Sequence, residues 1–365
     1  MLGLRHLFLT QSLVALAAAQ TFVVDANNGP GTNFTTLTAA VAAAPDGATL
    51  IVRFGNYHGT VLVAGKGLTI VGEPGASIDA VMVFNTTPGQ RFVLRGLPFF
   101  STAAGFLQLQ NCAGPVHIEN CGVAPFPLTP PPSSSLSALD CAQVYVTGST
   151  FRTTTGFGAS DVVLTNCSLA GGGGQSGLSQ SGGATTLANC TVTGGLSFGQ
   201  QLPAITVDTG VVRLLDGTSV GQSLTAAVHA IAGTGGVDVA PNVTLFGSTP
   251  VAPGIILAAV DEATTLSGAA LLGSSVNAEL RGSANLLGGL MFGDPAMPTA
   301  IPGIGGELWL NPTGFFAVQS LGTPLTASLA VPNVASLRGQ LFGWQGVTLG
   351  PIGVAFSNPA WFCIR

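Results

Sequence analysis

The feature that most constrains this chain is a five-residue apolar segment that recurs at intervals of about 18 to 28 residues. Its first and third residues are mostly apolar, and its fifth is Gly, Asn, Asp or Pro. This alternation predicts a strand with one buried side that ends in a turn. A single copy cannot bury its apolar side alone, so the copies must stack. They occupy residues 68–72, 92–96, 116–120, 144–148, 162–166, 185–189, 212–216 and 237–241.

The stretch 21–78 precedes the later copies and includes the first of them. It predicts a short helix over 37–44, a turn at 45–47 and strands over 49–53, 59–63 and 68–71. Its pattern resembles the N-terminal cap and first coil of right-handed parallel β-helix proteins, the pectin-lyase-like superfamily. The resemblance implies an all-β fold: a right-handed parallel β-helix with an N-terminal capping helix. The matching motifs are Asn33-Phe34-Thr35-Thr36-Leu37, Ala40-Val41, Asp46-Gly47, Gly55-Asn56-Tyr57, Lys66-Gly67-Leu68-Thr69-Ile70 and Gly72.

Composition excludes several other classes of protein. Only 7% of the residues are charged, which excludes the highly charged composition of disordered chains. The 52 glycines and the scarcity of Lys and Glu exclude long helices and suit short strands with tight turns. The net charge is −5 and Lys66 is the only lysine, so we expect no nucleic-acid partner.

The first residues predict export of the chain. Arg5 and His6 precede an apolar run that ends in small residues at 17–19. This arrangement is typical of a secretory signal peptide over 1–19, and the run is shorter than the roughly 20 residues of a membrane-spanning helix. We therefore expect a secreted or cell-surface protein whose mature chain has no membrane span.

The character of the sequence changes near residue 250, where Gly and Pro are frequent. We expect a parallel β-helix over 20–250 and a small antiparallel β-sandwich over 251–365. Residues 302–312 and 331–345 resemble a C-terminal module of secreted proteins from environmental bacteria. Trp309, Trp344 and Trp361 lie in this region, either as sugar-stacking platforms or as core residues.

The cysteines test how the copies stack. Cys112 and Cys141 precede their strands at similar positions, and Cys167 and Cys190 follow the turn residue of consecutive copies. Coils about 4.8 Å apart would bring each pair within the reach of a disulfide. We predict the stacked pairs Cys112–Cys141 and Cys167–Cys190, either as disulfides or as buried thiols.

The resemblance implies enzymes that act on polysaccharides, but their motifs are absent. We find no acidic calcium cluster of pectate lyases, no Asp-Phe-(Ile/Val)-Phe-Gly of pectin methylesterases and none of the four motifs of polygalacturonases. The outward second and fourth positions of neighbouring copies nevertheless place Arg95, His117, Glu119 and Tyr145 on one face. Arg could bind a uronate carboxylate, and His or Tyr could transfer the C5 proton in β-elimination. The alternative is an ordinary surface ion pair of Arg95 with Glu119, beside exposed His117 and Tyr145.

Two function classes follow from these observations. The first is a secreted protein that binds polysaccharide or extracellular matrix, or forms a surface structure, without catalysis. The second is a carbohydrate-active enzyme of the polysaccharide lyase type, with the four clustered residues as its site. The sequence implies no cofactor and no metal, because no Cys/His spacing matches a metal site. The oligomeric state is left open.

Overall fold

A computed structural model of the chain provides the structure. The predicted signal peptide falls on residues 1–19, which lie outside the described residues. The structure describes residues 20–364 except 100–104, 124–133, 153–154, 173, 198–199, 216, 222–228, 241–242, 248, 260–262, 268–269, 282–286, 321–324, 335–336, 338–339 and 352.

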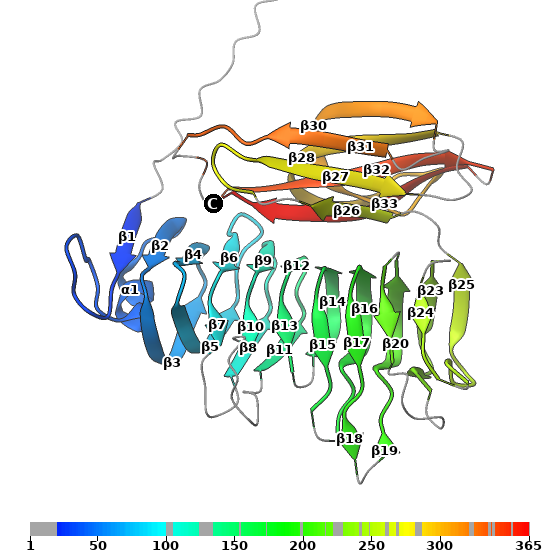
Figure 1. Ribbon diagram of the computed structural model, residues 1–365, viewed down its shortest axis with the longest axis horizontal. Coiled ribbons are helices and arrows are strands. Elements are labelled where there is room, and N and C mark those ends of the chain that lie inside the picture. The colour runs from blue at the N-terminus through cyan, green and yellow to red at the C-terminus, as the bar shows by residue number, and fades with distance from the viewer. Residues whose placement is uncertain are drawn as a thin grey trace, which may run out of the picture.

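The first part of the chain is a parallel β-helix, which confirms the predicted fold class (Figure 1). All pairings between its coils are parallel. Its first face, which we call the covered face, is formed by β1 (Thr21–Val24), β2 (Ala48–Val52), β4 (Leu68–Gly72), β6 (Phe92–Arg95), β9 (Val116–Glu119), β12 (Val144–Thr147), the second halves of β14 (Thr155–Thr165), β16 (Leu178–Ala188) and β20 (Ile205–Leu214), β23 (Gly236–Val239) and β25 (Ile256–Ala259).

Two further faces close each coil. One consists of β3 (Gly55–Ala64), β5 (Ala76–Phe84), β8 (Gly105–Gln110), β11 (Ser134–Leu139), the first halves of β14, β16 and β20, and β22 (Ile231–Gly233). The other, which we call the lower face, consists of β7 (Pro98–Phe99), β10 (Gly122–Val123), β13 (Thr150–Phe151), β15 (Ser168–Ala170), β17 (Thr191–Thr193), β21 (Ser219–Val220) and β24 (Thr244–Leu245). A two-stranded ribbon, β18 (Leu196–Ser197) with β19 (Gln200–Gln201), projects from the coils.

The register between coils is the predicted one. The second residues of successive copies are paired across the covered face in an unbroken series: Val93, His117, Tyr145, Val163, Thr186, Arg213 and Asp238. First and third residues point inward, as Phe92 and Leu94 illustrate, and most of them are buried in one continuous core. Period-2 alternation thus correctly separates the inward from the outward side chains.

The corners of the coils depend on residues that tolerate a left-handed backbone. Asn85, Asn111, Asn120, Asn166 and Asn189 all have φ between 51° and 55°. Asparagine is among the few residues other than glycine that adopt this conformation readily. The side chains also stack, since Asn189 Nδ2 donates to Asn166 Oδ1 at 2.6 Å and Asn111 Nδ2 donates to Asn85 Oδ1 at 3.2 Å.

A short helix closes one end of the coil stack. Helix α1 (Leu37–Ala43) starts at Thr36, whose Oγ1 accepts a hydrogen bond from Ala39 N, and it buries Leu37, Ala40 and Val41 in the core. Lys66 Nζ donates to the carbonyls of Val41 and Ala44, which satisfies the end of the helix. No helix of the described residues is long and apolar enough to cross a membrane.

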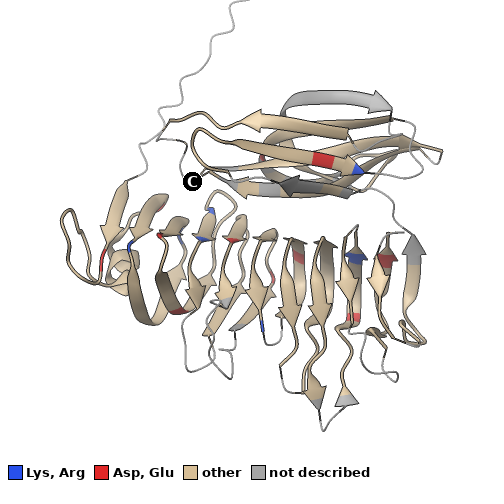
Figure 2. Ribbon diagram, in the orientation of Figure 1, with Lys and Arg blue, Asp and Glu red and all other residues tan. Residues whose placement is uncertain are grey.

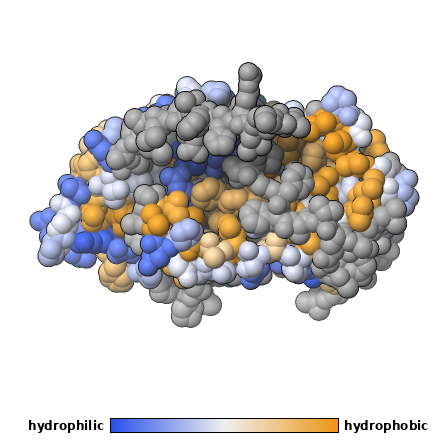
Figure 3. Space-filling model, turned by 90° about the horizontal axis from the view of Figure 1, so that it is seen from above, coloured by the Kyte–Doolittle hydropathy of each residue, from blue (hydrophilic) through white to orange (hydrophobic). Residues whose placement is uncertain are grey.

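The other end of the stack carries no such helix among the described residues. Its last strand, β25, exposes 70% of Ile256 and 54% of Leu257. Seen from above, hydrophilic side chains are frequent at the end that carries α1 and hydrophobic ones at the opposite end (Figure 3). Because β25 is paired with β23, the parallel coils extend beyond the predicted boundary at residue 250, and the Gly/Pro-rich segment near it is one more corner.

The remaining strands form two sheets that share a separate core, the C-terminal module. One sheet contains β26 (Ala263–Ser267), β27 (Ser275–Arg281) and β31 (Leu325–Ala330). The other contains β29 (Ile304–Gly305), β33 (Gly353–Cys363), β32 (Leu341–Gly350), β28 (Leu287–Ala300) and β30 (Glu307–Ser320). All pairings are antiparallel except β29 with β33. Val276, Leu280, Leu290, Trp344 and Phe362 pack between the two sheets. The module lies along the covered face of the β-helix (Figure 1).

Candidate functional site

The four residues predicted to cluster do come together. Arg95, Glu119, His117 and Tyr145 are neighbours through the pairings of β6 with β9 and of β9 with β12. Arg95 Nη2 lies 3.0 Å from Glu119 Oε1, and His117 Nε2 lies 3.4 Å from Glu119 Oε2. Tyr145 Oη donates to Gln143 Oε1 at 3.3 Å. A basic, an acidic and an imidazole group therefore share one network.

The predicted exposure of these residues is wrong. His117 and Tyr145 have no exposed surface, Arg95 is 2% exposed and Glu119 is 6% exposed. They point outward from the coil, as expected, but the C-terminal module covers them. The ion pair of Arg95 with Glu119 is consequently buried. It is not the surface ion pair that we gave as the alternative to a catalytic cluster.

The contact between the two modules has an apolar centre. Met291, Trp309 and Leu310 of the module pack against Val93, Tyr145 and Val163 of the covered face. The rings of Tyr145 and Trp309 meet edge to face, with centroids 6.1 Å apart. Gln143 Nε2 donates to the carbonyl of Ala296 at 2.7 Å and so links the two modules through a polar contact.

Burial governs the ionisation of this network. Burial lowers the pKa of His117 below its usual range, although the hydrogen bond that its imidazole donates to the Glu119 carboxylate opposes the shift. Burial also raises the pKa of Tyr145 well above its usual range. Arg95 Nη1 and His117 Nδ1 find no hydrogen-bond partner among the described residues. A neutral imidazole and a neutral phenol beneath a packed interface give a polysaccharide chain no access to a proton donor or acceptor.

The tryptophans of the C-terminal module are also buried where the structure describes their side chains. Trp309 is 5% exposed within the contact between modules, and Trp344 is fully buried in the core of the C-terminal module. Both are therefore packing residues and not sugar-stacking platforms. The side chain of Trp361 lies outside the described part of the structure.

The cysteine pairs are stacked as predicted. The pairing of Gln110 with Leu139 puts Cys112 beside Cys141 on adjacent coils, and all four paired cysteines are buried thiols here. A hydrogen bond between these two thiols lowers the pKa of Cys112 to about 7 and raises that of Cys141. Cys167 and Cys190 are hydrogen-bonded to each other in the same way. Burial raises the pKa of Cys190, and the hydrogen bond with Cys167 raises it further.

A column of hydroxyl groups on the lower face was missed by the sequence analysis. The pairings of β13, β15, β17, β21 and β24 align its five outward residues, of which Ser168, Thr191 and Thr244 are exposed. Adjacent strands lie about 4.8 Å apart, and the hydroxyls can approach more closely, since Ser219 Oγ donates to Thr191 Oγ1 at 3.3 Å. The hydroxyl column consists of Thr150, Ser168, Thr191, Ser219 and Thr244.

A regular signal for this column was present in the sequence. Thr150, Ser168 and Thr191 follow the turn residue of their copies by two positions, as in Asn166-Cys167-Ser168 and Asn189-Cys190-Thr191, and Ser219 and Thr244 follow it by three. The residue directly before Thr150, Ser168, Thr191 and Ser219 is buried, so the hydroxyl residue after it must face outward. Charged residues along the coils lie mainly near the covered face, and the lower face carries few of them (Figure 2).

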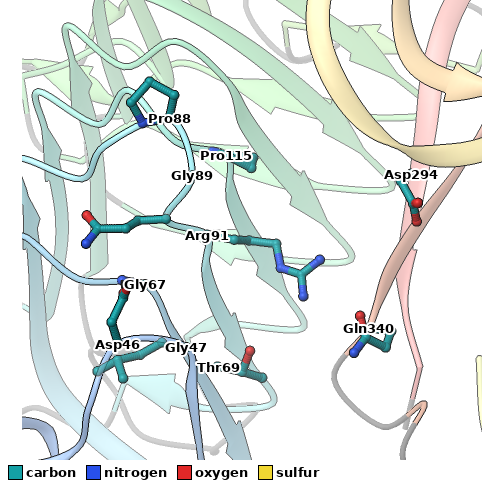
Figure 4. A pocket seen from close by; sticks show the side chains of 12 residues that line it. Asp46, Gly47, Gly67, Thr69, Pro88, Gly89, Arg91, Pro115, Asp294 and Gln340 are labelled. Carbon is teal, nitrogen blue, oxygen red and sulfur yellow. Dashed lines mark hydrogen bonds between the residues drawn. The ribbon is translucent and has the colours of Figure 1, made fainter. Parts of the chain in front are cut away.

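A cavity of about 430 Å³ lies between the first coils and the C-terminal module. Residues from four successive coils form one wall, and residues Asp294 and Gln340 of the module form the other (Figure 4). It does not include the four clustered residues. No group of three or more His, Cys, Asp or Glu in the described ranges is placed to hold a metal ion.

Comparisons with known proteins return no match to any family model, curated protein or solved structure. The class of protein is therefore defined by the fold: a parallel β-helix with an antiparallel C-terminal module.

Proposed function

We propose that this chain is a secreted, pectin-lyase-like β-helix protein that binds polysaccharide at the cell surface or in the extracellular matrix, without catalysis. The proposal combines the predicted signal peptide with the geometry of the covered face and the lower face. The observation that carries it is the burial of Arg95, His117, Glu119 and Tyr145 beneath the C-terminal module. This packing removes the only cluster that the sequence offered for β-elimination.

The hydroxyl column supports polysaccharide binding. Its residues are uncharged, their strands are fixed by parallel pairing, and three of them are exposed. Hydroxyls on a rigid sheet both donate and accept hydrogen bonds, as sugar hydroxyls do, and need little ordering on binding. A flat, repetitive face of this kind suits an insoluble glycan with its own regular repeat.

The test measures binding and catalysis on the same full-length protein. Incubated with pectin and alginate, the protein should produce no rise in the ultraviolet absorbance of unsaturated uronates. It should be retained by one or more insoluble glycans, and Thr191→Val should weaken retention because it removes one hydroxyl at nearly constant shape. Ser137→Ala serves as the control, because it removes an exposed hydroxyl on another face of the β-helix. A rise in absorbance, or adsorption to no glycan, would contradict the proposal.

A further inference from the structure

The cavity between the two modules is built on a rigid backbone. Gly47 N donates to Gly67 O at 2.8 Å, and Asp46 Oδ1 accepts from Gly67 N at 2.6 Å. A Cβ on Gly67 would lie 2.6 Å from the carbonyl oxygen of Arg91, so glycine there lets the third loop pack closely. Gln90 then fixes that loop, because its amide bonds Thr87 N and Gly65 O.

The side chains around the cavity come from both modules. The guanidinium of Arg91 extends from the β-helix toward Asp294 and Gln340 of the C-terminal module (Figure 4). Thr69 also lines the cavity and lies near Arg91 on the β-helix side (Figure 4). Donors and acceptors thus converge on one space from opposite walls, which is typical of a preformed ligand site.

The charges and the apolar surface decide which ligand fits. Two carboxylates, Asp46 and Asp294, line the cavity with a single cation, Arg91. An anionic sugar would meet a net negative wall, whereas the hydroxyls of a neutral sugar can donate to carboxylates and accept from the guanidinium and amide. The rings of Pro88 and Pro115 supply apolar surface for the C–H groups of a pyranose. We propose that this cavity binds a neutral mono- or disaccharide unit.

The inference deepens the proposed glycan binding and rests on it only for the choice of a sugar as ligand. It concerns a second site, distinct from the hydroxyl column. Soluble disaccharides test the cavity, while adsorption to insoluble glycan tests the column, so the two proposals fail separately.

The experiment is calorimetric titration of the full-length protein with cellobiose, maltose, lactose and digalacturonate. One or more of the neutral disaccharides should bind, and digalacturonate should bind about tenfold more weakly or not at all. Arg91→Gln should weaken binding of the neutral sugar by about tenfold or more, because it removes charged hydrogen bonds. Asp294→Asn should also weaken it, from the opposite wall.

Two further variants make the result specific to the cavity. A Cβ at Gly89 would meet no atom within 4 Å, so Gly89→Phe should fill the space without straining the loop and abolish binding. Arg152→Gln removes an exposed arginine elsewhere on the coils and should leave binding unchanged. If no neutral disaccharide binds, if digalacturonate binds more tightly, or if Arg91→Gln and Gly89→Phe bind like the wild type, the assignment is overturned.

Discussion

Removing the charge of Glu119 should destabilise the protein far more than a surface mutation would. Only 2% of the Arg95 side chain and 8% of the Glu119 side chain are exposed, and their charged atoms are 3.0 Å apart. Glu119→Gln keeps the size of the side chain but leaves the Arg95 guanidinium buried without a counter-ion. Breaking a buried pair in this way costs about 3–5 kcal/mol, whereas an exposed pair contributes about 0–1 kcal/mol.

The assay is denaturant unfolding of wild type and variants at neutral pH. Glu279→Gln is the matched control, because it breaks the exposed pair with Arg281 and should change the free energy of unfolding by less than about 1 kcal/mol. The double variant Arg95→Met, Glu119→Gln should recover much of the loss, since it leaves no unpaired charge. A loss below about 1 kcal/mol for Glu119→Gln would refute the buried arrangement.

Three further predictions test separate parts of the structure. Because burial keeps His117 neutral in the folded chain, the free energy of unfolding should fall below about pH 6.5 by up to about 1.4 kcal/mol per pH unit. His117→Gln should reduce this slope, and an unchanged slope in unfolding curves would contradict the burial of a neutral imidazole. Mild oxidation should join Cys112 to Cys141, and a peptide map that pairs Cys112 with Cys121 instead would disprove the stacking. At φ 55°, Asn166→Ala should cost about 1–2 kcal/mol by calorimetry and Asn166→Gly less; equal losses would exclude backbone strain as the cause.

The stacking of the coils could be predicted from the sequence because it depends on local patterns. Alternation with period 2 determines which side chains of a strand face inward, and the corner asparagines mark where each strand ends. Those two signals were enough to align Val93, His117 and Tyr145 across three coils and to pair Cys112 with Cys141.

The burial of the covered face depends on contacts between residues far apart in the chain. Trp309 packs on Tyr145, and Asp294 and Gln340 complete a cavity whose other wall comes from the first coils. No local pattern specifies which faces of two modules will meet. One signal was available: the outward positions carry apolar Val93 and Val163 in the middle coils, which is unusual for a strand face in contact with water.

The end of the coils is hard to place from the sequence for a related reason. Gly and Pro mark a linker and a corner equally well, and only pairing distinguishes the two. Strand β25 pairs with β23, so the segment that precedes it belongs to the coils.

The most direct test of the central claim is chemical modification of the histidines in the folded, full-length protein. Diethyl pyrocarbonate reacts with accessible neutral imidazoles, and mass spectrometry locates the modified residues. His58 has a side chain that is 71% exposed and should be modified, whereas His117, at 0%, should remain unmodified until the protein unfolds. Modification of His117 at a rate similar to that of His58 would show an open face, and with it an accessible cluster that our account excludes.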